Sequence, residues 1–118
     1  MSHAELPAVI KRLPEADIPF PGVRGWISQS ESHQIVYMEI EAIGAVAPHS
    51  HGEQYGVVLD GEMLLTIGDQ TRTYRKGDSY LIPAGVTHSA TFPTRVLVID
   101  FFADPDRYRP KAAAVSYR

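Results

Sequence analysis

The sequence contains no cysteine among its 118 residues. This absence excludes disulfide bonds, thiolate metal sites, iron–sulfur clusters and cysteine nucleophiles. Any reactive site must therefore be built from histidine, carboxylate, tyrosine or hydroxyl side chains.

The sequence also lacks a cluster of basic residues and a long hydrophobic run. Fourteen acidic residues against eleven basic ones give a net charge of -3, which is not the charge pattern of a nucleic-acid-binding protein. The first thirty residues carry several charges and no apolar core of a signal peptide, and no segment has the length of a membrane span. We therefore expect a soluble, cytoplasmic protein with neither a nucleic-acid nor a membrane partner.

What the sequence does contain is frequent turn residues, nine glycines and nine prolines, within a hydrophobic content of 44%. The length corresponds to one domain, and the composition is that of a globular protein. We expect an extended, Pro-rich N-terminal arm over residues 1–25, a barrel over 26–103 and a C-terminal tail or docking segment over 104–118.

Short runs of strand-forming residues separated by turns follow the arm. Apolar and polar residues alternate in the first run, as in a half-buried strand, and Asp60-Gly61 between two apolar runs predicts a hairpin. The expected strands are 33–41, 54–59, 62–67, 71–75, 79–82, 86–92 and 95–103. Because no crossover helices are available to connect parallel strands, the pattern predicts an all-β antiparallel sandwich or barrel.

Three of the five histidines are candidates for a shared site. His49 and His51 stand two residues apart, so in an extended segment both imidazoles project from the same face and can chelate one ion. A His-x-His pair also arises by chance in a short chain. His88 lies far downstream on a predicted strand. The remaining two, His3 and His33, are interpreted as residues that bind no metal.

The segment from Gly44 to Phe92 resembles the two motifs of the cupin superfamily. The first motif is Gly, five residues, His-x-His, three or four residues, Glu, six residues and Gly; its counterparts here are Gly44, His49-Ser50-His51, Gln54 and Gly61. The second is Gly, five residues, Pro-x-Gly, two residues, His, three residues and Asn; its counterparts are Gly77, Pro83-Ala84-Gly85, His88 and Phe92. Both spacings beside the His-x-His pair are shorter than in the pattern, so the turn there must be tighter.

The resemblance implies a small antiparallel jelly-roll barrel, often dimeric, with a divalent metal in its mouth. The implied metal ligands are His49, His51, Gln54 and His88. Three imidazoles and an amide oxygen suit zinc, nickel, iron, manganese or copper better than calcium or magnesium. Phe92 stands at the Asn position, which is not a ligand position.

Gln54 or its neighbour Glu53 could be the fourth ligand, and only one of them can point at the metal. Gln54 shares a strand face with Gly56 and Val58, whereas Glu53 lies on the opposite face. The motif's spacing to Gly61 favours Gln54. A neutral amide there would leave the ion its full positive charge, which makes it a stronger Lewis acid.

Asp100 interrupts the apolar run of the last predicted strand. If its face lines the barrel interior, loss of solvent raises its pKa and makes it a candidate proton-transfer group. Alternatively, Asp100 forms a structural ion pair with an arginine. The arginines considered for that pair are Arg72, Arg75 and Arg95. Tyr80, on another predicted strand, is either a pocket phenol or a packing residue.

The end of the chain is similar to small cupins that act in pectin breakdown and open unsaturated galacturonate to its linear keto form. Those proteins combine three histidines and a glutamine with a terminal Asp-x-Phe followed by Pro and Arg. The counterparts here are Asp100, Phe102, Pro105 and Arg107. The resemblance implies catalytic roles for Asp100, Phe102 and Arg107, with the guanidinium clamping a substrate carboxylate through two parallel hydrogen bonds. Alternatively, Arg107 is a surface arginine.

These observations favour a divalent-metal-binding cupin that acts on a small polar molecule, a sugar acid, by metal-assisted isomerisation, tautomerisation or lyase chemistry. The alternatives are an iron-dependent dioxygenase and a non-catalytic metal- or sugar-binding module. We also expect a homodimer in which the N-terminal arm lies across the partner's sheet edge.

Overall fold

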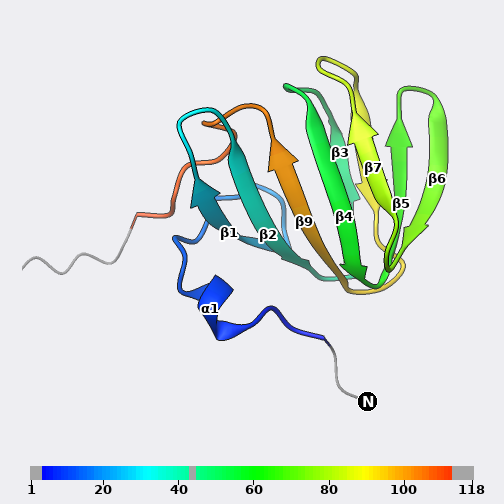
Figure 1. Cartoon of the computed structure of the whole chain (residues 1–118). Coiled ribbons are helices and arrows are strands. Elements are labelled where there is room, and N and C mark those ends of the chain that lie inside the picture. Colours follow the sequence, from blue (N-terminus) through cyan, green and yellow to red (C-terminus); the bar gives the residue numbers. More distant parts are fainter. Residues whose placement is uncertain (1–3, 43–44, 113–118) are drawn as a thin grey trace, which may run out of the picture.

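A computed structural model describes residues 4–42 and 45–112 and contains two antiparallel β-sheets packed face to face (Figure 1). The elements are α1 (Ala8–Lys11), β1 (Val23–Gln29), β2 (Gln34–Ile40), β3 (Ala45–His49), β4 (Gln54–Asp60), β5 (Glu62–Ile67), β6 (Gln70–Arg75), β7 (Ser79–Ile82), β8 (His88–Thr91) and β9 (Val96–Phe102). One sheet has the strand order β1-β2-β9-β4-β7 and the other the order β3-β8-β5-β6. The prediction of an all-β antiparallel jelly-roll barrel is confirmed.

Two strands differ from the sequence-based expectation. β1 begins at Val23, and Gly25 within it lies so close to β2 that an added Cβ would stand 2.7 Å from Val36 Cγ1. β3 was not expected, because its five residues include Pro48. The register against β8 shifts between Val46 and His49, and such an irregularity tolerates the missing proline N–H. The expected motif position Gly44 and His3 both lie outside the described residues.

The core lies between the two sheets and is formed by the inward faces of their strands. Alternation places every second residue of β2, β4 and β9 inside, as the sequence pattern indicates. Its most completely buried apolar side chains are Val36, Val58, Ile82, Val96, Val98 and Phe102. Strand identity and face therefore decide which polar residues share this interior.

The N-terminal segment packs on the barrel's own outer surface. It contains the single helical turn α1 and forms isolated bridges between Glu15 and Trp26 and between Ala16 and Pro110. Leu6 is buried, and its backbone N–H donates to the Glu39 carboxylate on β2 at 3.3 Å. The segment thus combines one helical turn with residues outside regular structure. Within the described residues, no helix combines the length and hydropathy that a membrane span needs.

Candidate metal centre

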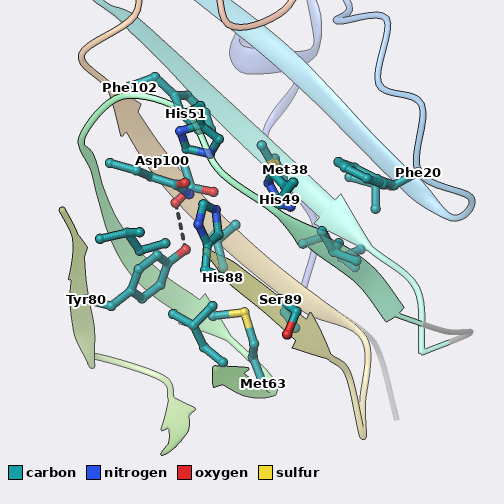
Figure 2. Close-up of a pocket in the computed structure, with 18 of the residues that line it drawn as sticks. Phe20, Met38, His49, His51, Met63, Tyr80, His88, Ser89, Asp100 and Phe102 are labelled. Atoms are coloured by element: carbon teal, nitrogen blue, oxygen red, sulfur yellow. Dashed lines mark hydrogen bonds between the residues drawn. The ribbon is translucent and has the colours of Figure 1, made fainter. Parts of the chain in front are cut away.

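A cavity of about 70 Å³ opens between the sheets at one end of the barrel (Figure 2). Antiparallel pairing brings the last residue of β3, the first residues of β4 and β8 and the last residues of β9 to this same end. The polar and charged residues that line the cavity are His49, His51, Gln54, Tyr80, His88, Ser89, Asp100, Arg107 and Tyr108. Its remaining walls are apolar and include Met38, Met63 and Phe92. The cavity therefore combines a reactive polar end with an apolar interior.

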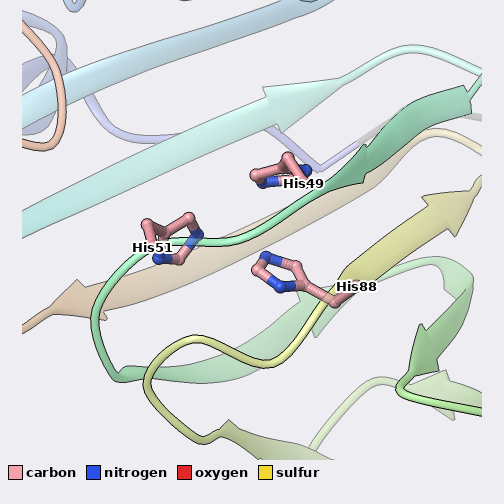
Figure 3. A group of neighbouring side chains, drawn as sticks. All are labelled: His49, His51 and His88. Atoms are coloured by element: carbon pink, nitrogen blue, oxygen red, sulfur yellow. The ribbon is translucent and has the colours of Figure 1, made fainter.

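Three histidine rings converge in this cavity (Figure 3). His49 ends β3 and pairs in register with His88 at the start of β8, while His51 lies in the following turn. The ring centroids of His49 and His88 are 4.3 Å apart, and those of His51 and His88 are 4.7 Å apart. One ligand nitrogen from each ring lies within 4.8 Å of the others, so the three side chains could hold one metal ion.

Backbone carbonyls fix which nitrogen of each ring is free. Each of the three Nδ1 atoms lies within hydrogen-bond distance of a carbonyl oxygen. The acceptors are Ala47 at 2.8 Å, Gly52 at 2.8 Å and Val86 at 3.0 Å. Because a carbonyl oxygen only accepts, Nδ1 carries the hydrogen and Nε2 presents its lone pair. His51 Nε2 is buried with no hydrogen-bond partner in the described structure. Three such nitrogens fit a divalent transition metal.

Burial favours the neutral form of two imidazoles of the cluster, those of His51 and His88. Burial is the main cause that lowers the pKa of His51 to about 4, with the positive charge of Arg107 acting in the same direction. Burial also lowers the pKa of His88. Because only a neutral imidazole binds a metal ion, both side chains are ready to do so at neutral pH.

Gln54 and Glu53 lie on opposite faces of β4, as their parity indicates. The Gln54 side chain is buried and lines the cavity, whereas Glu53 is exposed. The Glu53 backbone carbonyl accepts a hydrogen bond from the Ala103 N–H at 2.9 Å, which joins the start of β4 to the end of β9. The structure therefore brings Gln54 together with the histidines and leaves Glu53 outside.

The tight turn after His51 is closed by the C-terminal segment. The Gly52 backbone N–H donates to Asp104 Oδ2 at 2.8 Å. The carboxylate lies where a side chain would be, since a Cβ built on Gly52 would stand 2.3 Å from Asp104 Oδ1. On the other side, the His51 carbonyl accepts from the Gly85 N–H at 2.8 Å. These contacts explain how a spacer of only two residues can connect His51 to Gln54.

Asp100 and Tyr80 form a buried pair that spans β4. In the inward row across the sheet, Asp100 on β9 pairs with Gly56 on β4, and Gly56 pairs with Tyr80 on β7. The Tyr80 hydroxyl donates to Asp100 Oδ1 at 2.6 Å (Figure 2). The ring crosses the position of a missing side chain, because a Cβ on Gly56 would stand 2.1 Å from Tyr80 Cζ. Glycine at this position is therefore required for the contact.

Burial raises the pKa of Asp100 to about 6, although the Tyr80 hydroxyl, the Gln54 amide and the Arg107 charge each act to lower it. Burial likewise raises the pKa of Tyr80 well above its usual value, so the phenol keeps its proton. Within the described residues, Asp100 forms no ion pair with Arg72, Arg75 or Arg95, so the alternative of a structural pairing with one of them is wrong; Arg75 pairs with Glu62 and Arg95 with Glu39.

Arg107 and Phe102 also line the cavity. The guanidinium carbon of Arg107 lies 4.2 Å from the Tyr108 ring centroid and 5.6 Å from that of Phe102. Its Nε is buried with no hydrogen-bond partner in the described structure, so the interpretation as a surface arginine is wrong. Tyr108 is held by Gln34, whose amide donates to the Tyr108 carbonyl at 2.9 Å and whose oxygen accepts from the Tyr108 N–H at 3.0 Å.

Two contributions to the site were not found from the sequence. Phe20, from the N-terminal segment, lies beside His49 with ring centroids 5.5 Å apart and lines the cavity (Figure 2). Asp104, which fixes the turn at Gly52, was assigned to a tail. Neither carries a local signal, because each acts through a contact between segments far apart in the chain. The prolines of the N-terminal arm indicated an extended segment, but not its position.

Comparison with known proteins assigns the chain to a family. Residues 36–102, more than half of the chain, match the family model described as Cupin domain. The chain belongs to this family.

Individual relatives agree with this assignment. A protein named H2HPP isomerase from Bacillus subtilis is 35% identical over 83 residues, which cover 67% of this chain but only 35% of that protein. The chain thus spans about a third of that relative's length.

Among solved structures, an RmlC-like cupin from Shewanella frigidimarina has a TM-score of 0.72 at 23% identity, covering 81% of this chain and 87% of its own. KdgF from Halomonas sp. has a TM-score of 0.66 at 24% identity, covering 74% and 84%. At these identities the structural likeness establishes the fold alone.

Proposed function

We propose that this chain is a metal-dependent enzyme that isomerises or tautomerises a small carboxylic acid, with a sugar acid as the substrate class. The observation that carries the proposal is the convergence of three kinds of group on one cavity. These are a three-histidine cluster, a buried carboxylate with a raised pKa and a guanidinium whose buried Nε has no hydrogen-bond partner in the described structure. Such an isomerisation needs a metal ion, a proton-transfer group and a group that binds the negative charge of the substrate.

The proposed metal ligands are His49, His51 and His88, with Gln54 as the fourth. A carboxamide offers both a donor and an acceptor. The Gln54 amide can therefore serve Asp100 through its nitrogen and keep its oxygen for the ion. A divalent ion bound by these groups supplies Lewis acidity that polarises a carbonyl or hydroxyl oxygen of the substrate.

Asp100 is the proposed proton-transfer group. With a pKa of about 6 it is largely ionised at neutral pH yet basic enough to accept a proton from a carbon or hydroxyl. The Tyr80 hydroxyl donates to Oδ1 and so fixes the orientation of the carboxylate in the cavity wall. Arg107 binds the substrate carboxylate, and Phe102, packed edge-on against His51 with ring centroids 5.5 Å apart, limits access of water.

The relative named H2HPP isomerase is consistent with an isomerisation, although it is about three times as long as the matched segment. The chain's similarity to the uronate-opening cupins in its glutamine and terminal Asp-x-Phe motif supports the sugar acid as substrate. The name of the relative supports an isomerisation, and the terminal motif supports a small acid as the substrate.

A screen of small acids, including unsaturated uronates, tests the proposal. Turnover is followed by the loss of the substrate's unsaturated absorbance, with wild-type protein purified without an affinity tag. Asp100→Asn is expected to lower kcat by roughly a hundredfold or more, because proton transfer by a positioned group contributes about that much. The control is Asp69→Asn, an exposed carboxylate in the turn between β5 and β6. Full turnover by Asp100→Asn would exclude the proton-transfer role.

An iron-dependent dioxygenase is the second candidate, because three imidazoles serve iron equally well. Salicylate 1,2-dioxygenase from Pseudoaminobacter salicylatoxidans shares the fold, with a TM-score of 0.68 at 18% identity over 74% of this chain and 26% of that one. Oxygen uptake during turnover marks this function. A shift in melting temperature on ligand addition without turnover marks a non-catalytic binding module.

A further inference from the structure

A turn just before β1 carries an aromatic side chain to one wall of the candidate metal centre. Phe20 lies three residues before the start of β1, and its ring lies beside that of His49 at the end of β3, with centroids 5.5 Å apart (Figure 2). β1 is the first strand in the order of the five-stranded sheet, and β3 is the first in that of the four-stranded sheet. Phe20 therefore bridges an edge of one sheet to an edge of the other, beside the cavity.

The backbone of the turn holds Phe20 in place. The Phe20 carbonyl accepts a hydrogen bond from the Val23 N–H at 3.3 Å, and Gly22 has a φ of +76°. Pro21 and Gly22 are the residues that a type II turn favours at its two central positions, because the second position needs a positive φ. The Gly22 carbonyl also accepts from the Glu41 N–H at 3.0 Å, directly after β2. The ring is thus a fixed wall, and a ligand must fit against it.

The cavity lining around Phe20 is apolar. We call the four lining residues on this side the side wall; they are Phe20, Val23 on β1, Ile40 on β2 and Val46 on β3. Val23 and Ile40 face each other in the β1–β2 pair, and both valines pack against the core. None of the four side chains can form a hydrogen bond. The side wall can therefore discriminate between ligands only by their size and shape.

We propose that Phe20 is a specificity-determining residue that sets the largest acid the cavity accepts. The inference rests on the proposed function, because the ligand is taken to be a carboxylic acid bound beside the histidine cluster and Arg107. The cavity has a volume of only about 70 Å³, so one aromatic ring decides how much of a ligand fits next to His49. A smaller side chain in place of Phe20 enlarges the cavity on this side, and a larger one reduces it.

Support of the metal ligand His49 is the alternative role for the Phe20 ring. His49 has other supports, because its Nδ1 lies 2.8 Å from the Ala47 carbonyl oxygen and its backbone pairs with His88. Removal of the ring is therefore expected to leave the metal content unchanged. Metal content is the measurement that separates size selection from support of His49.

Isothermal titration calorimetry with acetate, benzoate and 2-naphthoate tests the inference on protein as purified. Wild-type protein is expected to bind benzoate roughly tenfold or more tightly than the wider 2-naphthoate, since pocket size discriminates by about this factor. Phe20→Ala is expected to bind 2-naphthoate roughly tenfold more tightly than the wild type does, with acetate unchanged. Phe20→Trp is expected to act in the opposite direction, with benzoate binding weakened by roughly tenfold and acetate again unchanged.

Phe101→Ala is the matched control, because Phe101 is a partly exposed phenylalanine, at 39%, on β9 and outside the cavity. This variant is expected to bind all three acids as the wild type does. Circular dichroism and elemental analysis check the fold and the metal content of each variant.

The same ratio of affinities in the wild type, Phe20→Ala and Phe20→Trp overturns the inference, and so does a wild-type protein that binds 2-naphthoate as tightly as benzoate. Loss of metal from folded Phe20→Ala overturns it as well, because Phe20 then supports His49. If none of the proteins binds any of the acids, the proposed acid-binding function is wrong and the inference fails with it. Unaltered size preference in variants that do bind acetate leaves the proposed function intact.

Discussion

The Asp100 carboxylate is held by neighbours that have separate effects on its pKa. Burial raises the pKa, and the hydrogen bond from Tyr80 lowers it. The contact exists only because Gly56, between them in the inward row, has no side chain. The lack of a side chain at Gly56 therefore allows the contact that lowers the pKa of Asp100, the group that we propose transfers the proton.

Tyr80→Phe is expected to shift the pH profile of the reaction to higher pH. Loss of the hydroxyl removes a hydrogen bond that stabilises the charged form of Asp100, so the pKa of the carboxyl rises above its present value of about 6. A base must be ionised to act, and the acid limb of the kcat profile then moves upward by roughly one pH unit. Kinetic measurements from pH 5 to 9 detect this shift. An unchanged limb with merely lower stability would assign Tyr80 a packing role only.

At the scale of single residues, the sequence predicted which strand face Gln54 and Glu53 occupy, but it did not predict the position of Arg107. The parity of β4 was enough to place Gln54 inside and Glu53 outside, because a strand's side chains alternate without exception unless it bulges. The position of Arg107 was left open, because its guanidinium is enclosed by the rings of Phe102 and Tyr108 and by a segment without regular structure. A glycine inside a strand such as Gly56 does indicate a close approach, but not by which residue.

The turn that carries His51 and the C-terminal segment behave as one element. The carboxylate of Asp104 accepts from the Gly52 N–H, and the Ala103 N–H donates to the Glu53 carbonyl. Sequence motifs describe the histidine spacing within one segment, so they cannot include a contact made by a residue fifty positions away. The sequence shows the shortened spacer after His51, but it does not show that Asp104 stabilises the resulting turn.

Asp104→Ala is expected to lower metal affinity by roughly tenfold, because the support that orients a metal ligand typically contributes that much or more. Without the carboxylate, the Gly52 N–H loses its partner and the His51 turn is less well fixed. Asp104→Asn is expected to retain most of the affinity, since its amide oxygen still accepts the hydrogen bond. Competition with a chromophoric chelator measures both. Equal affinities in all three proteins would show that the turn needs no such support.

The N-terminal segment is attached to the barrel through Glu39. Lys11 lies 2.9 Å and Arg95 3.4 Å from its carboxylate, and the Leu6 N–H donates to it. Burial alone would raise the pKa of Glu39, but these groups together hold it below its usual value of 4.5. The ion pairs therefore stabilise the folded state at neutral pH, and this contribution disappears as the pH falls through the folded-state pKa.

Glu39→Gln is expected to lower the free energy of unfolding at pH 7 by roughly 1–2 kcal/mol, because Lys11 and Arg95 lose their shared buried carboxylate and keep only the exposed partners Glu5 and Glu41. The difference between the two proteins should shrink as the pH falls through the lowered folded-state pKa of Glu39, because the wild-type carboxylate then becomes protonated. Urea unfolding at several pH values measures this, with the exposed Glu31→Gln as control. A difference that is the same at every pH would point to lost packing instead of lost charge.

For the molecule as a whole, local patterns predicted the fold almost completely, because antiparallel strands joined by short turns leave few alternative arrangements. Alternation and turn residues located seven of the nine strands close to their observed bounds. The sequence-based predictions failed where an element is defined by the segment that it packs against. β3 contains Pro48 and is defined by pairing with β8, and the N-terminal segment is ordered by packing on the outer sheet face. Such contacts carry no periodic signal in their own segments.

The central claim is that the three converging histidines hold a metal ion, and elemental analysis of protein purified without an affinity tag tests it most directly. Wild-type protein is expected to carry one divalent transition-metal ion per chain, and His88→Ala to carry almost none. His33→Ala, which removes a histidine stacked on Phe101 outside the cavity, should retain the wild-type content. Metal content in folded His88→Ala equal to that of the wild type would contradict the assignment of the site.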